Sequence, residues 1–297
     1  MNFNFEEDIK HTIRHDFSGY GIVLPSRKDL HQSLTDYFTI AKKMIRPVPR
    51  TVDVAPDLLK SLPEHPKQDE IKYLADCFTN GKDVNLFQNK RLFQPGFHDH
   101  LAYEWNIYHL HLSFEKERKN HFQKQVKSLL FVYILPERAI LLGTDNHSTP
   151  FGSTRWQEIL HDHFPEAIEE YKDGTIQDVS PKLSGKERQE LWDKGYTLGM
   201  TKVRDTIYHN PGIGRSTSGH SSIVISQTIR IERWLFTIND QFQEYYEKVC
   251  KAIAVDPEKA SFRLQFGKRT FEVVETTSDT TILTYPEYLN TDLLDKP

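Results

Sequence analysis

Residues 105–114 read WNIYHLHLSF, and this stretch decides the fold. Successive side chains of a β-strand point to opposite faces of a sheet. A strand over residues 107–114 therefore places one set on a largely apolar face, namely Tyr108, Leu110, Leu112 and Phe114. The other face carries Ile107, His109, His111 and Ser113. We expect Leu110 and Leu112 to be buried, and His109 and His111 to lie on an open face of the sheet.

Two apolar runs follow this strand and predict a hairpin. Residues 129–134 read LLFVYI and residues 139–142 read AILL, with only LPER between them. A connection this short joins antiparallel strands. The second run leads into GTDNH at residues 143–147, which places His147 at the end of a strand.

Helices are predicted on either side of these strands. Residues 68–80 have one apolar face, and Gly81 stands where a C-terminal cap belongs. Another helix begins near Thr154 and carries apolar residues as far as Tyr171. The expected fold class is α+β, with a central antiparallel sheet flanked by helices, a helical N-terminal arm, and a C-terminal long helix plus β-hairpin.

We expect three segments along the chain. Residues 1–66 form a helical N-terminal arm and linker, in which residues 47–66 contain five prolines. This proline-containing stretch is either a flexible linker or an irregular but packed arm. Residues 67–175 form the α+β core domain that bears the histidines. Residues 185–297 form a C-terminal domain with the long helix and the hairpin.

The C-terminal third contains a strand near residues 196–209, a glycine- and serine-containing loop, a long helix and a hairpin over residues 262–274. The β-branched run at residues 223–229 favours a strand instead of the start of the helix. The regular spacing of apolar residues along the helix is typical of coiled coils and predicts a homodimer. That spacing alternates between four and three at Val224, Thr228, Ile231, Leu235, Ile238, Phe242, Tyr245 and Val249.

Composition excludes several classes of protein. Hydrophobic residues make up 37% of the chain, which is enough for a packed core, so general disorder is excluded. Lys and Arg number 38 against 42 Asp and Glu, so the chain lacks a general basic coat for nucleic acid. The longest apolar run, residues 129–135, is too short to span a membrane. The acidic N-terminal residues and only two cysteines, Cys77 and Cys250, favour a cytoplasmic protein without a signal peptide or disulfides.

Histidines are concentrated in the predicted core domain, at residues 98, 100, 109, 111, 121, 147, 161 and 163. A His-x-His pair on a strand directs both rings to one face, which suits a divalent metal. His109 and His111 are therefore an alternative metal site, with further ligands from Asp99, Asp145 or His147. The spacing fits no established zinc motif, and we assign no metal ligand in the leading hypothesis.

The leading hypothesis is acid–base catalysis without a cofactor. Imidazole titrates near neutral pH, so two histidines can serve as base and acid around a phosphodiester. RNA cleavage by its own 2′-hydroxyl requires that pair together with cations for the phosphate. We assign His111 as base and His147 as acid, with the order open to exchange, and His109 beside them. The candidate phosphate-binding cations are Lys90, Arg91, Arg118 and Arg155.

Residues 109–147 also resemble a known family. The order of a helix, consecutive antiparallel strands and a final Gly-x-x-His-like turn is similar to the RelE- and barnase-like ribonucleases. The resemblance implies a sheet that binds RNA and cleaves it without metal, and it points to His109, His111 and His147. The large N- and C-terminal additions depart from those small toxins. Residues 105–112 also resemble uncharacterised bacterial proteins, which implies no activity.

The loop at residues 210–222 is a second candidate site. If the long helix begins near Ser218, its N-terminal N–H groups can hold an anion, with Arg215 and His220 adding charge. The alternative is an ordinary surface loop with a serine cap.

Three functions therefore remain open. The first is an RNA-cleaving effector of a toxin or anti-phage system, whose partners are RNA and an inhibitor or partner protein, with no membrane. The second is a metal-dependent phosphoesterase, and the third is a non-enzymatic binding or oligomerisation module.

Overall fold

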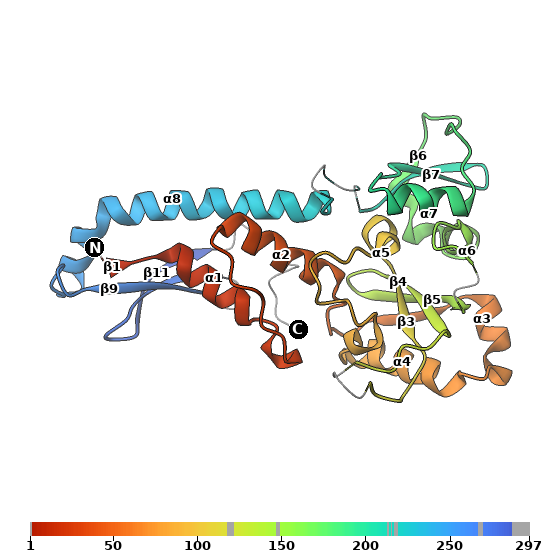
Figure 1. Cartoon of the computed structure of the whole chain (residues 1–297), viewed down its shortest axis with the longest axis horizontal. Coiled ribbons are helices and arrows are strands. Elements are labelled where there is room, and N and C mark those ends of the chain that lie inside the picture. The colour runs from red at the N-terminus through yellow and green to blue at the C-terminus, as the bar shows by residue number, and fades with distance from the viewer. Residues whose placement is uncertain are drawn as a thin grey trace. The chain divides into compact units, whose positions relative to one another are not determined.

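The computed structural model describes residues 2–117, 122–146, 149–212, 214, 216, 219–266 and 270–286. They form an α+β protein that divides into two compact units (Figure 1). The first unit joins the N-terminal 41 residues to the segment that starts at Val224. The second unit starts at Lys42 and ends at Ile223. This division differs from the three consecutive segments expected from the sequence, because the two ends of the chain fold together.

The second unit is built on a four-stranded sheet with the strand order β2-β5-β4-β3. The strands β3 (Ile107–His111), β4 (Leu129–Ile134) and β5 (Arg138–Asp145) are antiparallel neighbours, as predicted. The strand β2 (Thr51–Val54) pairs with β5 in parallel. The interpretation of residues 47–66 as a linker is therefore wrong, since they supply an edge strand and α3 (Pro56–Ser61).

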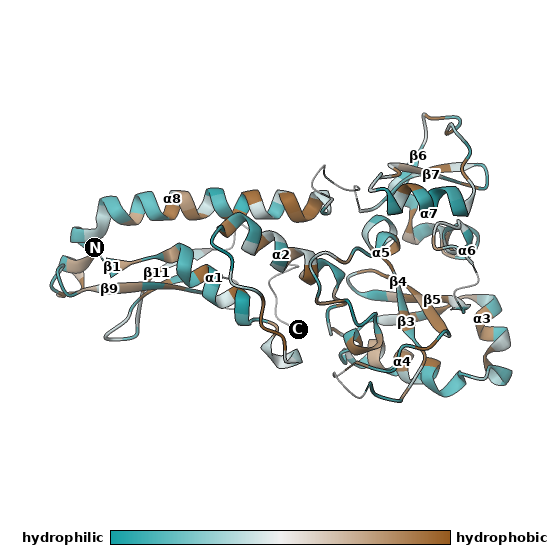
Figure 2. Ribbon diagram, in the orientation of Figure 1, coloured by the Kyte–Doolittle hydropathy of each residue, from teal (hydrophilic) through white to brown (hydrophobic). Residues whose placement is uncertain are grey.

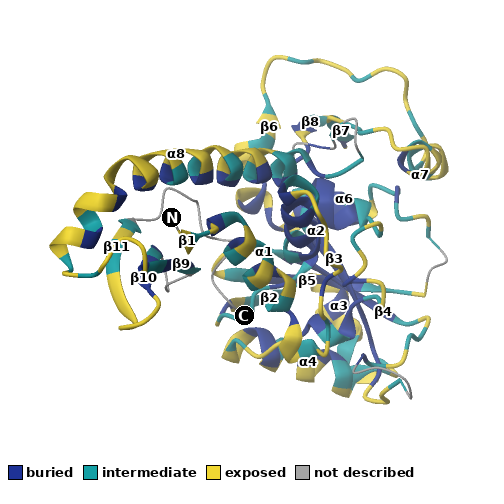
Figure 3. Cartoon of the chain, turned by 60° about the vertical axis from the view of Figure 1, so that its left-hand side comes forward, coloured by how far each residue is buried: buried dark blue, intermediate teal, exposed yellow. Residues whose placement is uncertain are grey.

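Both faces of this sheet are covered, and Figure 3 shows its strands largely in dark blue. The predicted alternation of β3 is confirmed, because Tyr108, Leu110 and Leu112 pack in one core and Ile107 in another. The first core is closed by α3 and by α4 (Gln68–Asn80). The second is closed by α5 (His100–Trp105), α6 (Arg155–His163) and α7 (Gly185–Asp193). The expectation of an open histidine face is therefore wrong.

Local signals explain where several of these helices end. Gly81 caps α4 in the left-handed conformation, at φ 65°, and a Cβ there would meet Pro49 at 2.7 Å. The helix α6 stops at His163 rather than continuing to Tyr171, because Pro165 cannot continue it. Two short 3₁₀ turns fill the remaining residues.

A smaller sheet completes the second unit. It consists of β6 (Lys172–Asp173), β8 (Thr206–His209) and β7 (Met200–Val203), in that order. The predicted strand at residues 196–209 is therefore a hairpin rather than one strand.

The first unit packs α1 (Phe5–His15), α2 (Leu30–Lys43) and α8 (Ser222–Ala252) with a second four-stranded sheet. That sheet has the order β1-β9-β10-β11, with the bounds Asn2–Phe3, Ser261–Phe266, Thr270–Glu275 and Thr280–Pro286. The parallel pairing of β1 with β9 ties the N-terminus to the predicted C-terminal hairpin, which is confirmed as β9 and β10. The helix prediction for residues 224–249 is also confirmed, so the β-branched run does not form a strand.

The apolar seam of α8 lies inside its own unit. Its buried residues continue as Phe242, Tyr246 and Cys250, so the spacing drifts to four and Tyr245 and Val249 leave the seam. The ring of Phe242 packs against Phe3, Phe5 and Phe262 of the same unit. Figure 2 shows hydrophobic and hydrophilic residues alternating along the helix. The seam therefore gives no argument for self-pairing, and the basis of the predicted homodimer is removed.

Within the described part of the chain, no helix has the length and hydropathy needed to cross a membrane. Cys77 and Cys250 are free and buried.

Candidate functional site

The candidate site begins at the contact between Asp99 and His109. Asp99 precedes α5, and its Oδ1 accepts the backbone N–H of Ala102, so the carboxylate is the N-terminal cap of that helix. The helix returns through Asn106, in the left-handed conformation, directly into β3. This return places the other carboxylate oxygen, Oδ2, 3.3 Å from Nδ1 of His109. A carboxylate at this position favours the protonated, positively charged form of the imidazole.

His111 lies two residues further along the same strand and the same face. Its Nδ1 donates to the carbonyl oxygen of Val126 at 2.7 Å. Because a carbonyl oxygen only accepts, Nδ1 carries a proton, and Nε2 is the nitrogen that can exchange one. The ring centroids of His109 and His111 are 6.3 Å apart. Two imidazoles at this separation can reach two oxygens of one phosphate, since each hydrogen bond spans about 2.6–3.2 Å.

The register of the sheet brings a charged pair to the same face. His111 is opposite Leu129, and Leu129 is opposite Asp145 at the end of β5. Oδ2 of Asp145 lies 3.3 Å from Nη1 of Arg155, the first residue of α6. The guanidinium of Arg155 also lies over the ring of Trp156, with 4.7 Å to the ring centroid. Of the predicted phosphate-binding cations, Arg155 is the one that the fold carries to the histidine face.

The histidines themselves are covered. His109 is 8% exposed and His111 is 4% exposed, which corrects the prediction that they face solvent. The ring of Phe151 lies over His109, at 5.1 Å between centroids, and Phe131 lies at 6.1 Å. An RNA strand reaches these rings only if the segment that carries Phe151 moves aside.

Other predicted residues are placed elsewhere or not described. His147, Arg118 and Arg215 lie outside the described residues. Lys90 and Arg91 are exposed, and the guanidinium of Arg91 lies 4.3 Å from the centroid of the Phe97 ring.

A buried lysine lies on the other side of Asp99. The Nζ of Lys43 donates to the carbonyl oxygens of Gln94 and Phe97, at 2.8 and 3.1 Å. Burial lowers the pKa of Lys43 to about 7, although the negative charge of Asp99 acts in the opposite direction. Sequence reasoning missed this residue, because it lies at the polar C-terminal end of α2 beside Lys42.

The predicted anion-binding loop differs in detail from the expectation. The long helix starts at Ser222, not near Ser218. His220 faces His98, with 5.8 Å between their ring centroids, and His98 also contacts the ring of Tyr103. The loop therefore adjoins the residues that lead to Asp99, but it is separate from the face of His109 and His111.

The donor set for a metal is incomplete among the residues whose structure is described. No group of three or more His, Cys, Asp or Glu side chains there is arranged to hold an ion. The alternative divalent site at His109 and His111 would need further ligands from outside those residues.

A buried polar cluster beside this site was not predicted. Glu104 of α5 is 1% exposed and accepts hydrogen bonds from Nε1 of Trp192, the backbone N–H of Leu198 and Nδ2 of Asn210. Burial raises the pKa of Glu104 to about 7, against the effect of these three donors. The chain approaches so closely here that a Cβ on Gly212 would lie 1.4 Å from the carbonyl oxygen of Tyr103.

This cluster fixes α5, and with it Asp99, against α7 and the β7–β8 hairpin. Its donors come from more than 85 residues further along the chain than Glu104. No local pattern in the sequence announces such a contact.

No protein-family model, curated protein or solved structure matches the chain.

Proposed function

We propose that the chain is a cytoplasmic endoribonuclease that cleaves RNA by acid–base catalysis without a metal. The observation that carries this proposal is the carboxylate of Asp99 at Nδ1 of His109, with a second imidazole on the same strand face. A base oriented by a carboxylate is the arrangement that general-base catalysis requires. The order of helix and antiparallel strands that resembles the RelE- and barnase-like ribonucleases supports the choice of RNA as substrate.

The two histidines receive different roles from their partners. Nε2 of His109 takes the proton of a ribose 2′-hydroxyl, because the carboxylate of Asp99 stabilises the resulting imidazolium. His111 acts as the acid, since Nδ1 already donates to a carbonyl and the second proton sits on Nε2. This assignment replaces the earlier hypothesis of His111 as base and His147 as acid.

The reaction is an internal transfer of the phosphate. The deprotonated 2′-oxygen attacks the adjacent phosphorus while the bond to the 5′-oxygen breaks. Nε2–H of His111 gives its proton to that leaving oxygen, so the products are a 2′,3′-cyclic phosphate and a 5′-hydroxyl. The guanidinium of Arg155 is the cation positioned to stabilise negative charge on the phosphorane.

The proposal is tested with an RNA oligonucleotide that contains a single 2′-deoxynucleotide at the preferred cleavage position. We expect cleavage of the all-ribose strand to a cyclic phosphate and no cleavage at the deoxy position. Cleavage at the deoxy position would contradict the mechanism, because the attacking oxygen would then come from water.

The burial of His109 and His111 favours a second candidate, a non-enzymatic binding module in which both rings are structural. In that case the chain binds a partner protein and leaves RNA intact. As an effector of a toxin or anti-phage system, the ribonuclease would also require an inhibitor protein to protect its own cell.

A further inference from the structure

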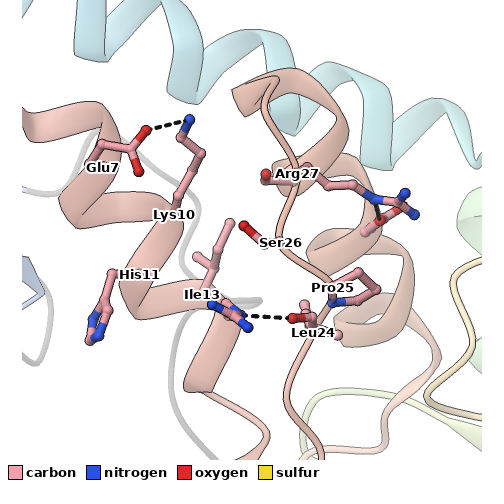
Figure 4. A pocket seen from close by; sticks show the side chains of 11 residues that line it. Glu7, Lys10, His11, Ile13, Leu24, Pro25, Ser26 and Arg27 are labelled. Atoms are coloured by element: carbon pink, nitrogen blue, oxygen red, sulfur yellow. Dashed lines mark hydrogen bonds and ion pairs between the residues drawn. The ribbon is translucent and has the colours of Figure 1, made fainter.

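A hollow in the first unit has no part in the proposed reaction. It encloses about 540 Å³, including the part open to solvent, between α1, the loop at residues 24–27 and α2 (Figure 4). Pockets for small molecules have volumes of about 300–1,000 Å³. Its wall combines apolar surface from Ile13, Leu24 and Pro25 with the hydroxyls of Ser26 and Ser33.

Positive charge predominates in this hollow. Lys10, His11 and Arg14 lie along one side of α1, and Arg27 faces them from the loop. The two carboxylates of the hollow, Glu7 and Asp36, are already paired. Figure 4 shows the pair between Glu7 and Lys10, which are 2.7 Å apart, and Oδ2 of Asp36 accepts Nε of Arg27 at 3.0 Å. A local excess of cations is unexpected in a chain with a net charge of −4.

The two guanidinium groups are held by one edge only. Nε of Arg14 donates to the carbonyl oxygen of Leu24 at 3.1 Å, and the N–H of Leu24 donates back to the carbonyl of Arg14 at 2.9 Å. Nε of Arg27 is likewise used by Asp36. Among the described residues, the terminal nitrogens of both guanidiniums have no hydrogen-bond acceptor. Fixed guanidiniums with open terminal nitrogens match the paired oxygens of a phosphate.

We infer that this hollow binds a phosphorylated small molecule of mononucleotide size. Arg14 and Arg27 contact the phosphate, and Ser26 donates a further hydrogen bond from the loop. Leu24 and Pro25 provide an apolar surface for the rest of the ligand. A dianionic phosphate is favoured over a single carboxylate, because the two unsaturated guanidiniums supply two positive charges.

The test is equilibrium binding of AMP, inorganic phosphate and adenosine to the full chain by isothermal titration calorimetry. We expect AMP and phosphate to bind saturably and adenosine to bind at least about tenfold more weakly than AMP. Arg14→Gln should weaken AMP binding by about tenfold or more, and Arg14→Lys by less. Arg230→Gln removes an exposed arginine of α8 in the same unit and should leave binding unchanged.

Thermal unfolding separates a lost site from a lost fold. Arg27→Lys retains an ion pair with the buried Asp36, so it tests the second guanidinium without leaving that carboxylate unpaired. If AMP and phosphate show no saturable binding up to about 10 mM, the inference is wrong. Equal binding by wild type and a folded Arg14→Gln variant also contradicts it, as does equal affinity for adenosine and AMP.

Discussion

Oδ2 of Asp99 lies 3.3 Å from Nδ1 of His109, and its partner oxygen caps α5 through the N–H of Ala102. One carboxylate thus joins the start of a helix to the strand that the helix leads into. The two roles can be separated by mutation, because asparagine caps helices about as well as aspartate but carries no charge.

Asp99→Asn should leave the fold intact and slow RNA cleavage by at least about tenfold, since His109 loses the charge that stabilises its protonated form. The measurement is the single-turnover cleavage rate, with circular dichroism as the check on folding. Asp76→Asn, at an exposed ion pair with Lys82, is the matched control and should cleave at the wild-type rate. Equal rates for Asp99→Asn and Asp76→Asn would show that the carboxylate is only a helix cap.

Stability measurements distinguish the two faces of β3. Leu110 is fully buried, so Leu110→Ala should lower the free energy of unfolding by about 2–5 kcal/mol. His111→Ala should cost about 1–3 kcal/mol, because it leaves the buried carbonyl of Val126 without its donor. Denaturant unfolding of both variants checks these values. A negligible cost for His111→Ala would mean that its ring faces solvent after all.

Glu104 should make the stability of the protein depend on pH in a defined window. Its pKa in the folded state is about 7, above the ordinary value of 4.5, so the folded chain holds a proton there that the unfolded chain has released. The stability that Glu104 contributes is therefore fully present below pH 4.5 and is lost as the pH rises through 7. The change amounts to a few kcal/mol, since each pKa unit corresponds to about 1.4 kcal/mol.

Glu104→Gln isolates this effect, because glutamine resembles the protonated acid and does not titrate. The advantage of wild type over Glu104→Gln in free energy of unfolding should be larger at pH 5 than at pH 8. A difference that stays constant across this range would show that Glu104 is ionised in the folded protein throughout.

The seam of α8 should behave as core rather than as an interface. Leu235→Lys combined with Ile238→Lys should abolish cooperative unfolding of the first unit at every protein concentration, because both side chains are buried within it. Phe236→Lys is the control on the same helix, since Phe236 is 75% exposed. A folded monomer from the double variant, observed by light scattering together with circular dichroism, would restore the homodimer.

Short-range patterns in the sequence predicted the elements of the core well. The alternation around Leu110 and the short connection after Ile134 identified β3, β4 and β5, because strand periodicity and turn length are local properties. The same reasoning failed for β2, whose four residues follow closely spaced prolines and pair only with a strand more than 80 residues away. It also failed for the histidine face, since the helices that cover that face come from distant parts of the chain.

The candidate site was predicted in part for the same reason. His109 and His111 share a face because of strand geometry, and this is visible in the sequence. Asp99 could be proposed only as a possible metal ligand, because its contact with His109 depends on how α5 turns back into β3. Glu104 and Lys43 gave no signal, since neither residue type is expected to be buried.

The most direct test of the proposed function is the cleavage rate of an RNA oligonucleotide by the full chain in the presence of EDTA, compared with the His109→Ala and His111→Ala variants. The account predicts cleavage that EDTA does not change and that each variant reduces by about 10²- to 10⁴-fold while remaining folded. Cleavage that EDTA abolishes, cleavage that both folded variants retain, or no cleavage by wild type would each contradict it.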